Sequence, residues 1–311
     1  MELTSWGIMP LLWPGPPDFV KAPVDFGQLL LYTVSMHERM KPILHRADLF
    51  RCPLCQSQMT AGETSLRCER GHDFAISRKG YVDFCPAAKA GAYDDALFDS
   101  RSRFISAGFY AELIESLKAL LEKYAPTGPL LDAGCGEGSF LKALCPDPLA
   151  RPCIGLDLSR PGVQRAARGG GGWLWAVGDL SHLPLAEGSM AAILNILSPA
   201  NYPEFRRVLL PGGTVLKVVP GELYLHEVRA LAKDRLRRET YSNERVLKLF
   251  EEKFELLETE DICSTYPLTP SQAADLIAMT PLTQGIEKEQ LDLAALTKVT
   301  IHLHILAGRP R

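Results

Sequence analysis

A short apolar segment that runs through three glycines into a helical pattern constrains the fold of this chain more than any other feature. The segment reads Leu-Leu-Asp-Ala-Gly-Cys-Gly-Glu-Gly over residues 130–138, and the helical pattern starts near Ser139. Gly134 and Gly136 allow the backbone to turn tightly and to approach a ligand, and Gly138 lets the helix pack close to the strand. A strand, a glycine-rich turn and a helix in this order indicate the first unit of a parallel α/β sheet.

The chain beyond Pro126 repeats this alternation of short apolar runs and helical stretches. We also expect a hairpin-like turn at the Pro-Gly-Gly sequence of residues 211–213. The predicted fold class is therefore α/β, a doubly wound, seven-stranded Rossmann-like sheet. The expected strands cover residues 129–133, 152–158, 173–177, 191–196, 214–219, 254–262 and 299–306.

Length, net charge and the distribution of apolar residues limit the number of domains, the partners and the cellular location that we expect. A chain of 311 residues exceeds a single domain of about 150 residues, so a large domain with a small module is expected. The formal net charge of −3 does not indicate a protein that coats nucleic acid non-specifically. No apolar run is long enough for a membrane span, and residues 1–26 lack the basic start and apolar stretch of a secretory signal. We therefore expect a cytoplasmic protein with no membrane partner.

Clustered cysteines predict a metal site in the first part of the chain. Cys52, Cys55, Cys68 and His72 have the spacing C-x2-C-x12-C-x3-H, which suits tetrahedral Zn²⁺ with no position left for water. The surrounding segment is too short to fold on an apolar core alone, so we expect a structural zinc ion in a zinc-ribbon-like domain. Cys85 is an alternative fourth ligand if His72 turns away.

These patterns divide the chain into four parts. Residues 1–47 form an N-terminal extension of unknown role, either a genuine appendage or a product of the choice of gene start. Residues 48–86 form the zinc-binding module, and the polar residues 87–105 read as a linker. Residues 106–311 form the α/β domain, whose first helix is expected to start at Ser106.

Basic and aromatic side chains are concentrated in the zinc-binding module. Such a mixture can hold phosphates and stack bases, although solvated basic residues are equally common on small domains. The two interpretations, RNA contact and an ordinary solvated surface, stay open. The residues are Arg51, Arg67, Arg70, Arg78 and Lys79, with the aromatic residues Phe74, Tyr81 and Phe84.

Three acids identify the kind of cofactor that the glycine turn would bind. Asp157 ends the second expected strand, where a carboxylate can accept two ribose hydroxyls, and Asp179 follows the third, within reach of an adenine amine. Asp132 precedes the G-x-G-x-G turn, where it would face a positively charged group and repel a pyrophosphate. This arrangement resembles the S-adenosylmethionine site of class I methyltransferases more than the dinucleotide site of a nicotinamide enzyme. The cofactor glycines are Gly134, Gly136 and Gly138.

The end of the fourth strand is expected to border the methyl-accepting pocket. Ligands bind outside the carboxyl ends of the strands in open α/β sheets, and the segment Asn-Ile-Leu-Ser-Pro over residues 195–199 lies at such an end. An ordinary loop is the alternative interpretation. The sequence Leu-Leu-Pro-Gly-Gly over residues 209–213 also resembles the turn before the fifth strand in this superfamily.

From Cys52 to Leu306 the chain resembles the bacterial 23S rRNA guanine-N1 methyltransferases. The resemblance implies a zinc-dependent RNA-recognition domain, S-adenosylmethionine as methyl donor, and 23S rRNA as partner in rRNA processing. It also places Tyr110, Phe140 and Leu141 in the cofactor pocket. The matching segments are Cys-Pro-Leu-Cys (52–55), Cys-x-x-x-His-x-Phe (68–74), Lys-Gly-Tyr-Val (79–82), Ala-Gly-x-Tyr (107–110), Asp-x-Gly-Cys-Gly-Glu-Gly (132–138) and Met-Thr-Pro (279–281).

Two positions depart from the pattern of this family. Ala191 stands where members commonly carry an acid, and Tyr224 stands where they commonly carry a histidine, with His226 nearby. We expect Tyr224 to line the cofactor pocket in place of that histidine.

Guanine N1 carries a proton at neutral pH, so methylation there requires an unpaired base and a group that removes the proton. The candidates for catalytic residues are Asn195, Glu222 and His226. A helix over residues 222–238 carries Arg229, Lys233, Arg235, Arg237 and Arg238, which suit a phosphate backbone or an ordinary solvated face equally well.

Two rival functions follow from the same residues. A methyltransferase for a small molecule would use the zinc module only as structure, and a non-catalytic RNA-binding protein would bind the cofactor without turnover. The sequence leaves the oligomeric state open, a homodimer included.

Overall fold

The structure is a computed structural model that describes residues 38–86, 95–232, 243–283, 286 and 291–311. Most of the predicted extension, up to residue 37, lies outside the described residues, as do Lys233, Arg235, Arg237 and Arg238 of the predicted basic helix.

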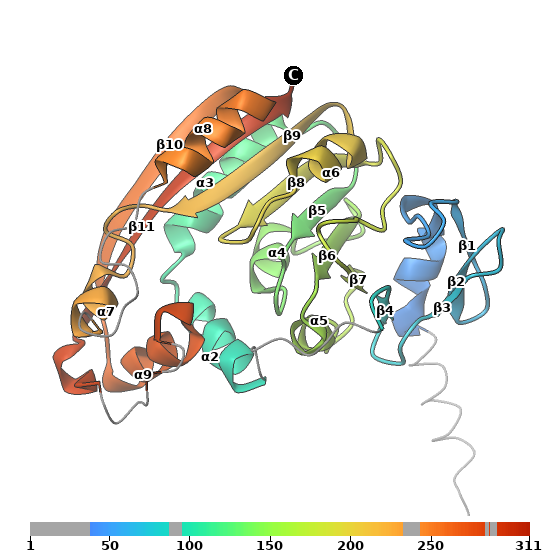
Figure 1. Cartoon of the computed structure of the whole chain (residues 1–311). Helices are drawn as coiled ribbons and strands as arrows, with labels where there is room; N and C mark the ends of the chain where they lie inside the picture. The colour runs from blue at the N-terminus through green and yellow to red at the C-terminus, as the bar shows by residue number, and fades with distance from the viewer. Residues whose placement is uncertain (1–37, 87–94, 233–242, 284–285, 287–290) are drawn as a thin grey trace, which may run out of the picture. The chain divides into compact units, whose positions relative to one another are not determined.

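An eight-stranded sheet forms the centre of residues 36–311, in the order β10-β11-β9-β8-β5-β6-β7-β4 (Figure 1). The strands from β9 to β4 run parallel, whereas β11 is antiparallel to both of its neighbours. All seven predicted strands are present. The strands of this sheet are β4 (Tyr81–Asp83), β5 (Leu130–Ala133), β6 (Cys153–Asp157), β7 (Leu174–Val177), β8 (Met190–Ile196), β9 (Leu209–Pro220), β10 (Phe254–Pro267) and β11 (Lys298–Pro310).

Helices connect and cover these strands, and a three-stranded sheet of β1 (Met59–Ala61), β2 (Ser65–Cys68) and β3 (Asp73–Ala75) holds the cysteine-rich part. A helix over residues 38–45 and the 3-10 helix η1 (Ala47–Leu49) precede that small sheet. The other helices are α2 (Asp95–Ser106), α3 (Ala111–Tyr124), α4 (Ser139–Leu144), α5 (Arg160–Ala166), α6 (Tyr202–Val208), α7 (His226–Leu231), α8 (Glu244–Lys253) and α9 (Pro270–Met279), with the short 3-10 helices η3 (Pro281–Thr283) and η5 (Leu293–Ala295).

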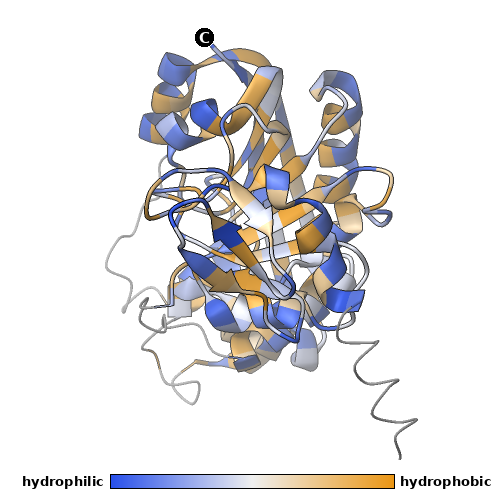
Figure 2. Ribbon diagram, turned by 90° about the vertical axis from the view of Figure 1, so that its right-hand side faces the viewer, coloured by the Kyte–Doolittle hydropathy of each residue, from blue (hydrophilic) through white to orange (hydrophobic). Residues whose placement is uncertain are grey.

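The central strands are buried on both faces because their side chains alternate between two cores. Leu130 of β5 packs into a core with α3, α4 and α5, whereas its neighbour Leu131 packs into a second core with α6 and α8. Figure 2 shows the central strands mostly in the hydrophobic colour, with the hydrophilic colour concentrated on the helices. No helix among the described residues is both long and apolar enough to cross a membrane.

The zinc-binding module contributes a strand and core residues to the main domain. β4 pairs in parallel with β7, with Val82 opposite Ala176, and becomes the eighth strand of a sheet for which the sequence predicted seven. Phe50 and Leu66 are fully buried in the core that also contains Ala176. The three residues of β4 are too few for a period-2 pattern, so only the pairing partner identifies them as a strand.

The predicted boundaries differ from the structure at two places. Residues 95–105, read as linker, lie in helix α2, which ends before Gly108; that glycine has a φ of +91°. Most residues of α2 are polar, so the sequence shows little sign of its buried face, which includes Phe98 and Phe104. Residues 38–47 of the predicted extension also pack into the core, where Ile43 is fully buried.

The hairpin predicted at residues 211–213 is wrong. Helix α6 lies between β8 and β9, so the two strands run parallel, and Pro211, Gly212 and Gly213 lie inside β9. The pairing register shifts between Met190 and Ala192, and Gly212 has a φ of +76°. The Pro-Gly-Gly sequence therefore accommodates an irregularity within a strand, which requires the same backbone freedom as a turn.

Candidate functional site

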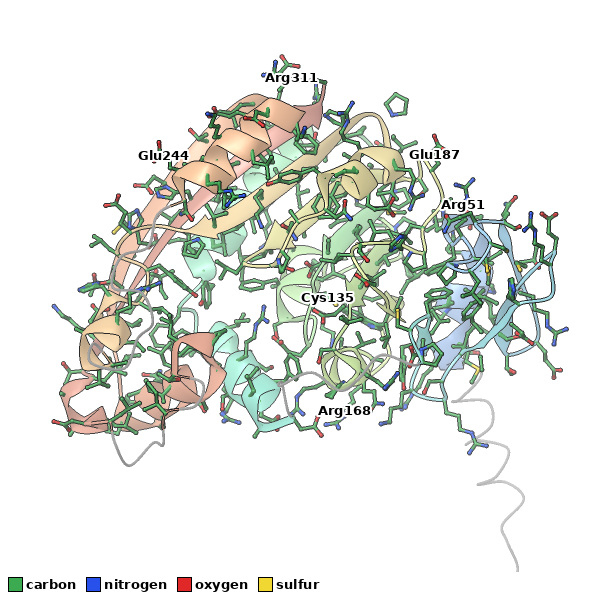
Figure 3. All side chains as sticks on the ribbon, viewed as in Figure 1. Arg51, Cys135, Arg168, Glu187, Glu244 and Arg311 are labelled. Carbon is green, nitrogen blue, oxygen red and sulfur yellow. The ribbon has the colours of Figure 1, made fainter. Side chains whose placement is uncertain are left out.

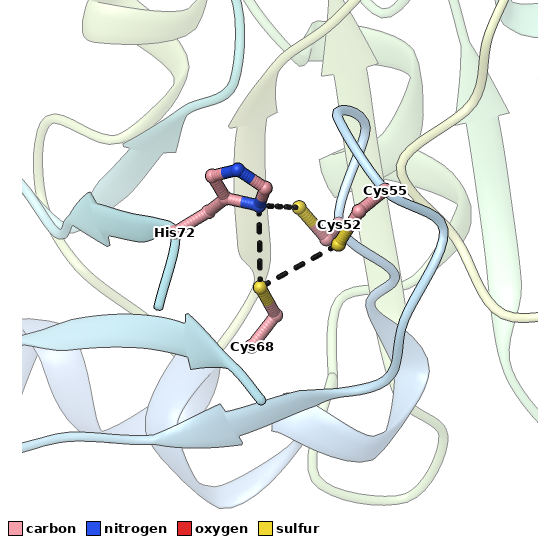
Figure 4. A group of neighbouring side chains, drawn as sticks. All are labelled: Cys52, Cys55, Cys68 and His72. Carbon is pink, nitrogen blue, oxygen red and sulfur yellow. Dashed lines mark hydrogen bonds between the residues drawn. The ribbon is translucent and has the colours of Figure 1, made fainter. Parts of the chain in front are cut away.

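The predicted zinc ligands converge in the structure (Figure 4). His72 Nδ1 lies 3.4 Å from the Sγ atoms of both Cys52 and Cys68, and the Sγ atoms of Cys55 and Cys68 are 3.6 Å apart. The four ligand atoms all lie within 4.8 Å of one another. Zn–S bonds of about 2.3 Å and a Zn–N bond of about 2.1 Å give tetrahedron edges of about 3.5 to 3.8 Å. The donor set and its spacing therefore fit a structural zinc ion.

Two tight turns bring these ligands together. Gln56 has a φ of +62° and donates its N–H to Cys52 O, which closes the turn between the first two cysteines. Gly71 has a φ of +84° and donates to Cys68 O at the start of the second turn. Cys85, the alternative ligand, lies outside this cluster, and burial raises the pKa of its thiol. The alternative to His72 is therefore wrong.

The aromatic residues of the zinc-binding module, for which base stacking is one of two open interpretations, are buried. Phe74, Tyr81 and Phe84 are each less than 9% exposed, and the Phe74 and Phe84 rings pack 5.1 Å apart. They therefore contribute to the core, and their burial argues against the interpretation in which these rings stack on bases. The basic residues remain on the surface, where Arg67 pairs with Asp73 and Lys79 donates to Gln164.

The glycine turn after β5 leaves no room for side chains. Gly134, Gly136 and Gly138 all have positive φ values, of +89°, +56° and +78°. A Cβ atom on Gly134 would lie 2.0 Å from Ser198 Oγ, and one on Gly138 would lie 2.4 Å from the Trp175 ring. Figure 3 labels Cys135 in this turn. The positive φ values therefore confirm the tight turn predicted at Gly134 and Gly136, and the Trp175 ring confirms the close packing predicted at Gly138, whereas the approach of a ligand to this turn stays a prediction.

The three predicted acids lie at the carboxyl ends of β5, β6 and β7. The carboxylate of Asp157 accepts the N–H groups of Gly136, at 2.8 Å, and of Ser159, at 2.7 Å. Asp179 Oδ1 accepts the N–H of Ser181 at 2.8 Å. A carboxylate has about four acceptor positions, so Asp157 can still accept hydroxyl groups while it holds the glycine turn.

Arg101 of α2 is a site residue that sequence reasoning missed, because it lies in the stretch read as linker. Its Nε is 3.5 Å from Glu137 Oε2, and its guanidinium lies over the Phe140 ring at 5.6 Å. A Cβ on Gly136 would come within 2.9 Å of Arg101 Nη1, so the guanidinium lies directly against the glycine turn. No spacing rule connects it to that turn, because only the tertiary fold brings α2 there.

Buried carboxylate oxygens at this turn show that the site fits a cationic ligand. Asp132 Oδ2 and both Glu137 oxygens are buried without a hydrogen bond within the part of the chain that the structure describes, and Glu137 Oε2 has the 3.5 Å ion pair with Arg101. Burial raises the pKa of Asp132 to about 7, with Arg101 opposing the shift and Asp157 adding to it. Buried polar groups are normally paired. The amino group of S-adenosylmethionine is a partner of the required charge.

Cofactor affinity is expected to rise with pH through the titration of Asp132. A cation stabilises the ionised carboxylate, so binding below pH 7 releases a proton, and affinity increases by up to about tenfold per pH unit. The cofactor amine titrates near about pH 8, so the test is confined to pH 5.5–7.5. Calorimetry with S-adenosylhomocysteine in two buffers of different ionisation enthalpy measures the proton release, and Asp132→Asn should abolish it. An affinity of the wild-type chain that stays constant over this range would contradict the assignment.

The two tyrosines predicted to line the cofactor pocket are in contact with each other in the structure. The hydroxyls of Tyr110 and Tyr224 are 2.7 Å apart, and the Tyr110 ring packs edge-on against Phe140 at 5.4 Å. Burial raises the pKa of both tyrosines, so both hydroxyls stay neutral and one donates to the other. Leu141 is fully buried in the core beneath them. The structure thus joins residues 114 positions apart in sequence.

Asn195 is committed to hydrogen bonds within the protein. Its Nδ2 donates to Ala133 O and Pro199 O, each at 2.9 Å, and its Oδ1 accepts from Lys217 Nζ at 2.6 Å. Lys217 also donates to Ser198 O at 2.5 Å, and burial lowers its pKa to about 8. Asn195 and Lys217 therefore shape the segment after β8. Sequence reasoning missed Lys217, although a lysine in the middle of an apolar strand was a usable signal.

The other two catalytic candidates follow the carboxyl end of β9. Glu222 is exposed. His226 is 44% exposed, and its Nδ1 lies 3.2 Å from Leu223 O and 3.4 Å from Glu227 Oε2. A carbonyl oxygen only accepts, so His226 Nδ1 carries the proton and Nε2 holds a free lone pair in the neutral ring.

Together, the doubly wound sheet, the carboxylates around the glycine turn and the Cys3His cluster define a class I methyltransferase that uses S-adenosylmethionine and carries a zinc ribbon. A zinc-ribbon model described as RlmA, N-terminal, matches residues 50–91, and a methyltransferase-domain model matches residues 130–213. The chain belongs to the 23S rRNA (guanine-N1)-methyltransferase family.

The similarity of this chain to two relatives shows that it belongs to this family. A Bacillus subtilis protein named as a 23S rRNA (guanine-N(1)-)-methyltransferase is 37% identical over 279 residues, which cover 84% of this chain and 97% of the relative. A Streptomyces fradiae protein named 23S rRNA (guanine(748)-N(1))-methyltransferase is 32% identical over 271 residues, which cover 84% of this chain and 96% of the relative.

Proposed function

We propose that this enzyme methylates N1 of an unpaired guanine in a hairpin loop of 23S rRNA, in the cytoplasm. One observation carries the proposal: relatives named for this reaction match the chain through both the zinc ribbon and the methyltransferase domain. The joining of β4 to β7 supports it, because the two parts share one sheet and one core. A target held by the zinc ribbon would therefore keep a constant position relative to the glycine turn.

The cofactor assignments are proposals built on the geometry of the site. S-adenosylmethionine supplies an electrophilic methyl group on its sulfonium. Asp157 accepts the ribose hydroxyls, and Asp179 accepts from the adenine amine. Asp132 and Glu137 face the cationic amino-acid end, where Arg101 can pair with the cofactor carboxylate. Gly134, Gly136 and Gly138 form the surface against which this ligand lies, and Tyr110, Phe140 and Tyr224 exclude water beside it.

On the acceptor side the protein positions the base and removes one proton. Asn195 and Lys217 hold the segment of residues 195–199, whose carbonyl groups can orient a purine edge. We assign the removal of the N1 proton to His226, since no hydrogen bond from a described residue occupies its Nε2 and its Nδ1–H is donated to Leu223 O. Glu222 is the second candidate in the same loop. Alignment of the base with the methyl group supplies much of the rate enhancement.

The proposal is tested on 23S rRNA incubated with the enzyme and methyl donor. A methyl group on guanine N1 blocks Watson–Crick pairing, so reverse transcriptase should stop one nucleotide before a single loop guanine. Nucleoside mass spectrometry of the same RNA should show 1-methylguanosine, and a reaction without donor is the control. Methyl incorporation without a stop would show that N1 is the wrong acceptor atom. No incorporation into RNA would favour a small-molecule substrate instead.

A further inference from the structure

The loop between β9 and α7 is held in place by the first half of β11. Gly221 donates to His302 O at 2.7 Å, and Leu225 donates to Thr300 O at 2.9 Å. Leu225 has a φ of +52°, a strained conformation for a leucine that its surroundings must maintain. Tyr224, which bonds to Tyr110, lies between these two anchors. The position of Tyr224 in the pocket therefore depends on contacts made by β11.

A histidine ring provides a further anchor for this loop. His302 Nδ1 lies 3.1 Å from the N atom of Leu223, and its Nε2 lies 3.0 Å from Asp261 Oδ1 on the neighbouring strand β10. The ring packs against Gly221, where an added Cβ would lie 2.5 Å from it. Only 12% of the His302 side chain is exposed, so the ring is fixed on three sides.

The partners of this ring determine its tautomer. A backbone N–H only donates, so His302 Nδ1 must accept and carries no proton. The proton is then on Nε2, where it is donated to the carboxylate of Asp261. Full protonation of the ring would place two donors face to face at Leu223. The geometry thus requires a neutral His302 with its proton on Nε2.

The same tautomer argues against a metal ion at this position. Asp261, His302 and His304 could each offer one ligand atom, with His304 Nδ1 2.8 Å from Asp261 Oδ1. A metal on His302 Nε2 would require the proton on Nδ1, and the Leu223 N–H would lose its acceptor. The cluster is therefore better described as two imidazoles that share one carboxylate.

We propose that His302, oriented by Asp261, is a positioning residue that holds the backbone of Leu223 and thereby places Tyr224 in the cofactor pocket. The inference rests on the proposed role of Tyr224 in cofactor binding. Tyr224 is one residue from the anchored N–H, so a displacement at Leu223 moves the Tyr224 backbone directly. Loss of the hydrogen bond between Leu223 and His302 should release the loop and disrupt the Tyr110–Tyr224 contact. Cofactor affinity should then fall, because binding would have to restore that contact.

Two substitutions of the same residue separate its two hydrogen bonds. In His302→Asn the side-chain oxygen can stand near the position of Nδ1 and accept from Leu223. In His302→Gln the side-chain nitrogen can stand near Nε2 and donate to Asp261, but the acceptor for Leu223 is lost. Calorimetry with S-adenosylhomocysteine on the full chain should show a loss of about three- to tenfold for His302→Gln and near wild-type affinity for His302→Asn. His304→Gln is the matched control, because His304 bonds to the same carboxylate.

The outcomes are distinct. Equal losses in His302→Asn and His302→Gln, or the same loss in His304→Gln, would overturn the assignment to the Leu223 bond. Nitrogen-15 NMR of the wild-type ring gives an independent readout: a proton on Nε2 supports the inference, and a proton on Nδ1 overturns it. A wild-type chain that binds no S-adenosylhomocysteine would overturn the proposed cofactor site, while the NMR result would still decide the state of His302. Added Zn²⁺ that shifts both rings would overturn the preference against a metal.

Discussion

Replacing Cys52 or Cys68 with serine is expected to release the zinc ion and to disrupt the edge of the main sheet as well as the small module. Structural zinc contributes apparent free energies of about 10 to 16 kcal/mol in small zinc domains, far more than the apolar contacts of such a module. β4 follows the ligands and pairs with β7, and Phe50 and Leu66 enter the shared core. Loss of the metal should therefore weaken the second core of the catalytic domain.

Metal analysis and hydrogen exchange measure the two parts of this prediction. The wild-type chain should contain about one zinc per molecule, and either variant should contain almost none. Amide protection should fall over residues 50–84 and also along β7. Cys263→Ser is the matched control, since Cys263 is an exposed cysteine on β10 far from the cluster in sequence. A metal-free wild-type chain that keeps full protection in the module would contradict the structural role of zinc.

Asp157→Ala should weaken binding of S-adenosylmethionine by about 2 to 3 kcal/mol, or about 30- to 150-fold in Kd. Two causes add together. The variant loses the charge-assisted hydrogen bonds proposed for the ribose. It also frees the N–H groups of Gly136 and Ser159, which the carboxylate holds at 2.8 and 2.7 Å.

Calorimetry on Asp157→Ala, Asp157→Asn and Asp147→Ala distinguishes the two causes. The amide oxygen of asparagine can still accept one backbone N–H, so Asp157→Asn should retain part of the affinity. Asp147 likewise accepts a backbone N–H, from Leu149, but lies in the loop between α4 and β6, so its variant should bind normally. Wild-type affinity in Asp157→Ala would show that the ribose lies elsewhere.

Short sequence patterns predicted much of this structure, because a tight turn or a metal site constrains which residue types can occupy a few neighbouring positions. The positive φ values at Gly134 and Gly136 follow from a turn in which the backbone must reverse within a few residues, and only glycine adopts that conformation freely. The zinc ligands were predictable because pairs of ligands close short loops on one ion. The Pro-Gly-Gly sequence of residues 211–213 shows where local patterns fail to predict the structure. The same backbone freedom suits either a hairpin turn or an irregularity within a strand.

The buried states of individual side chains were not predictable in this way. Phe74 and Phe84 lie in a segment of the sequence that also carries several arginines, and only the packing of Phe84 against both Phe50 and Phe74 shows that these rings belong to the core. Asn195 has the chemistry of a residue that binds a base, but its amide is occupied by Pro199 of its own segment and by Ala133 and Lys217 of the neighbouring strands.

The sequence by itself determined the class of sheet, the positions of seven of its eight strands, the glycine turn, the acids at the strand ends and the four zinc ligands, because short-range geometry requires these residue types at these spacings. The tertiary structure alone decided that β4 completes the sheet, that Arg101 lies against the glycine turn, and that His302 anchors the loop of Tyr224. Each of these depends on contacts between residues that are distant in the sequence, and such contacts are selected by packing and pairing, which leave no spacing pattern in the chain.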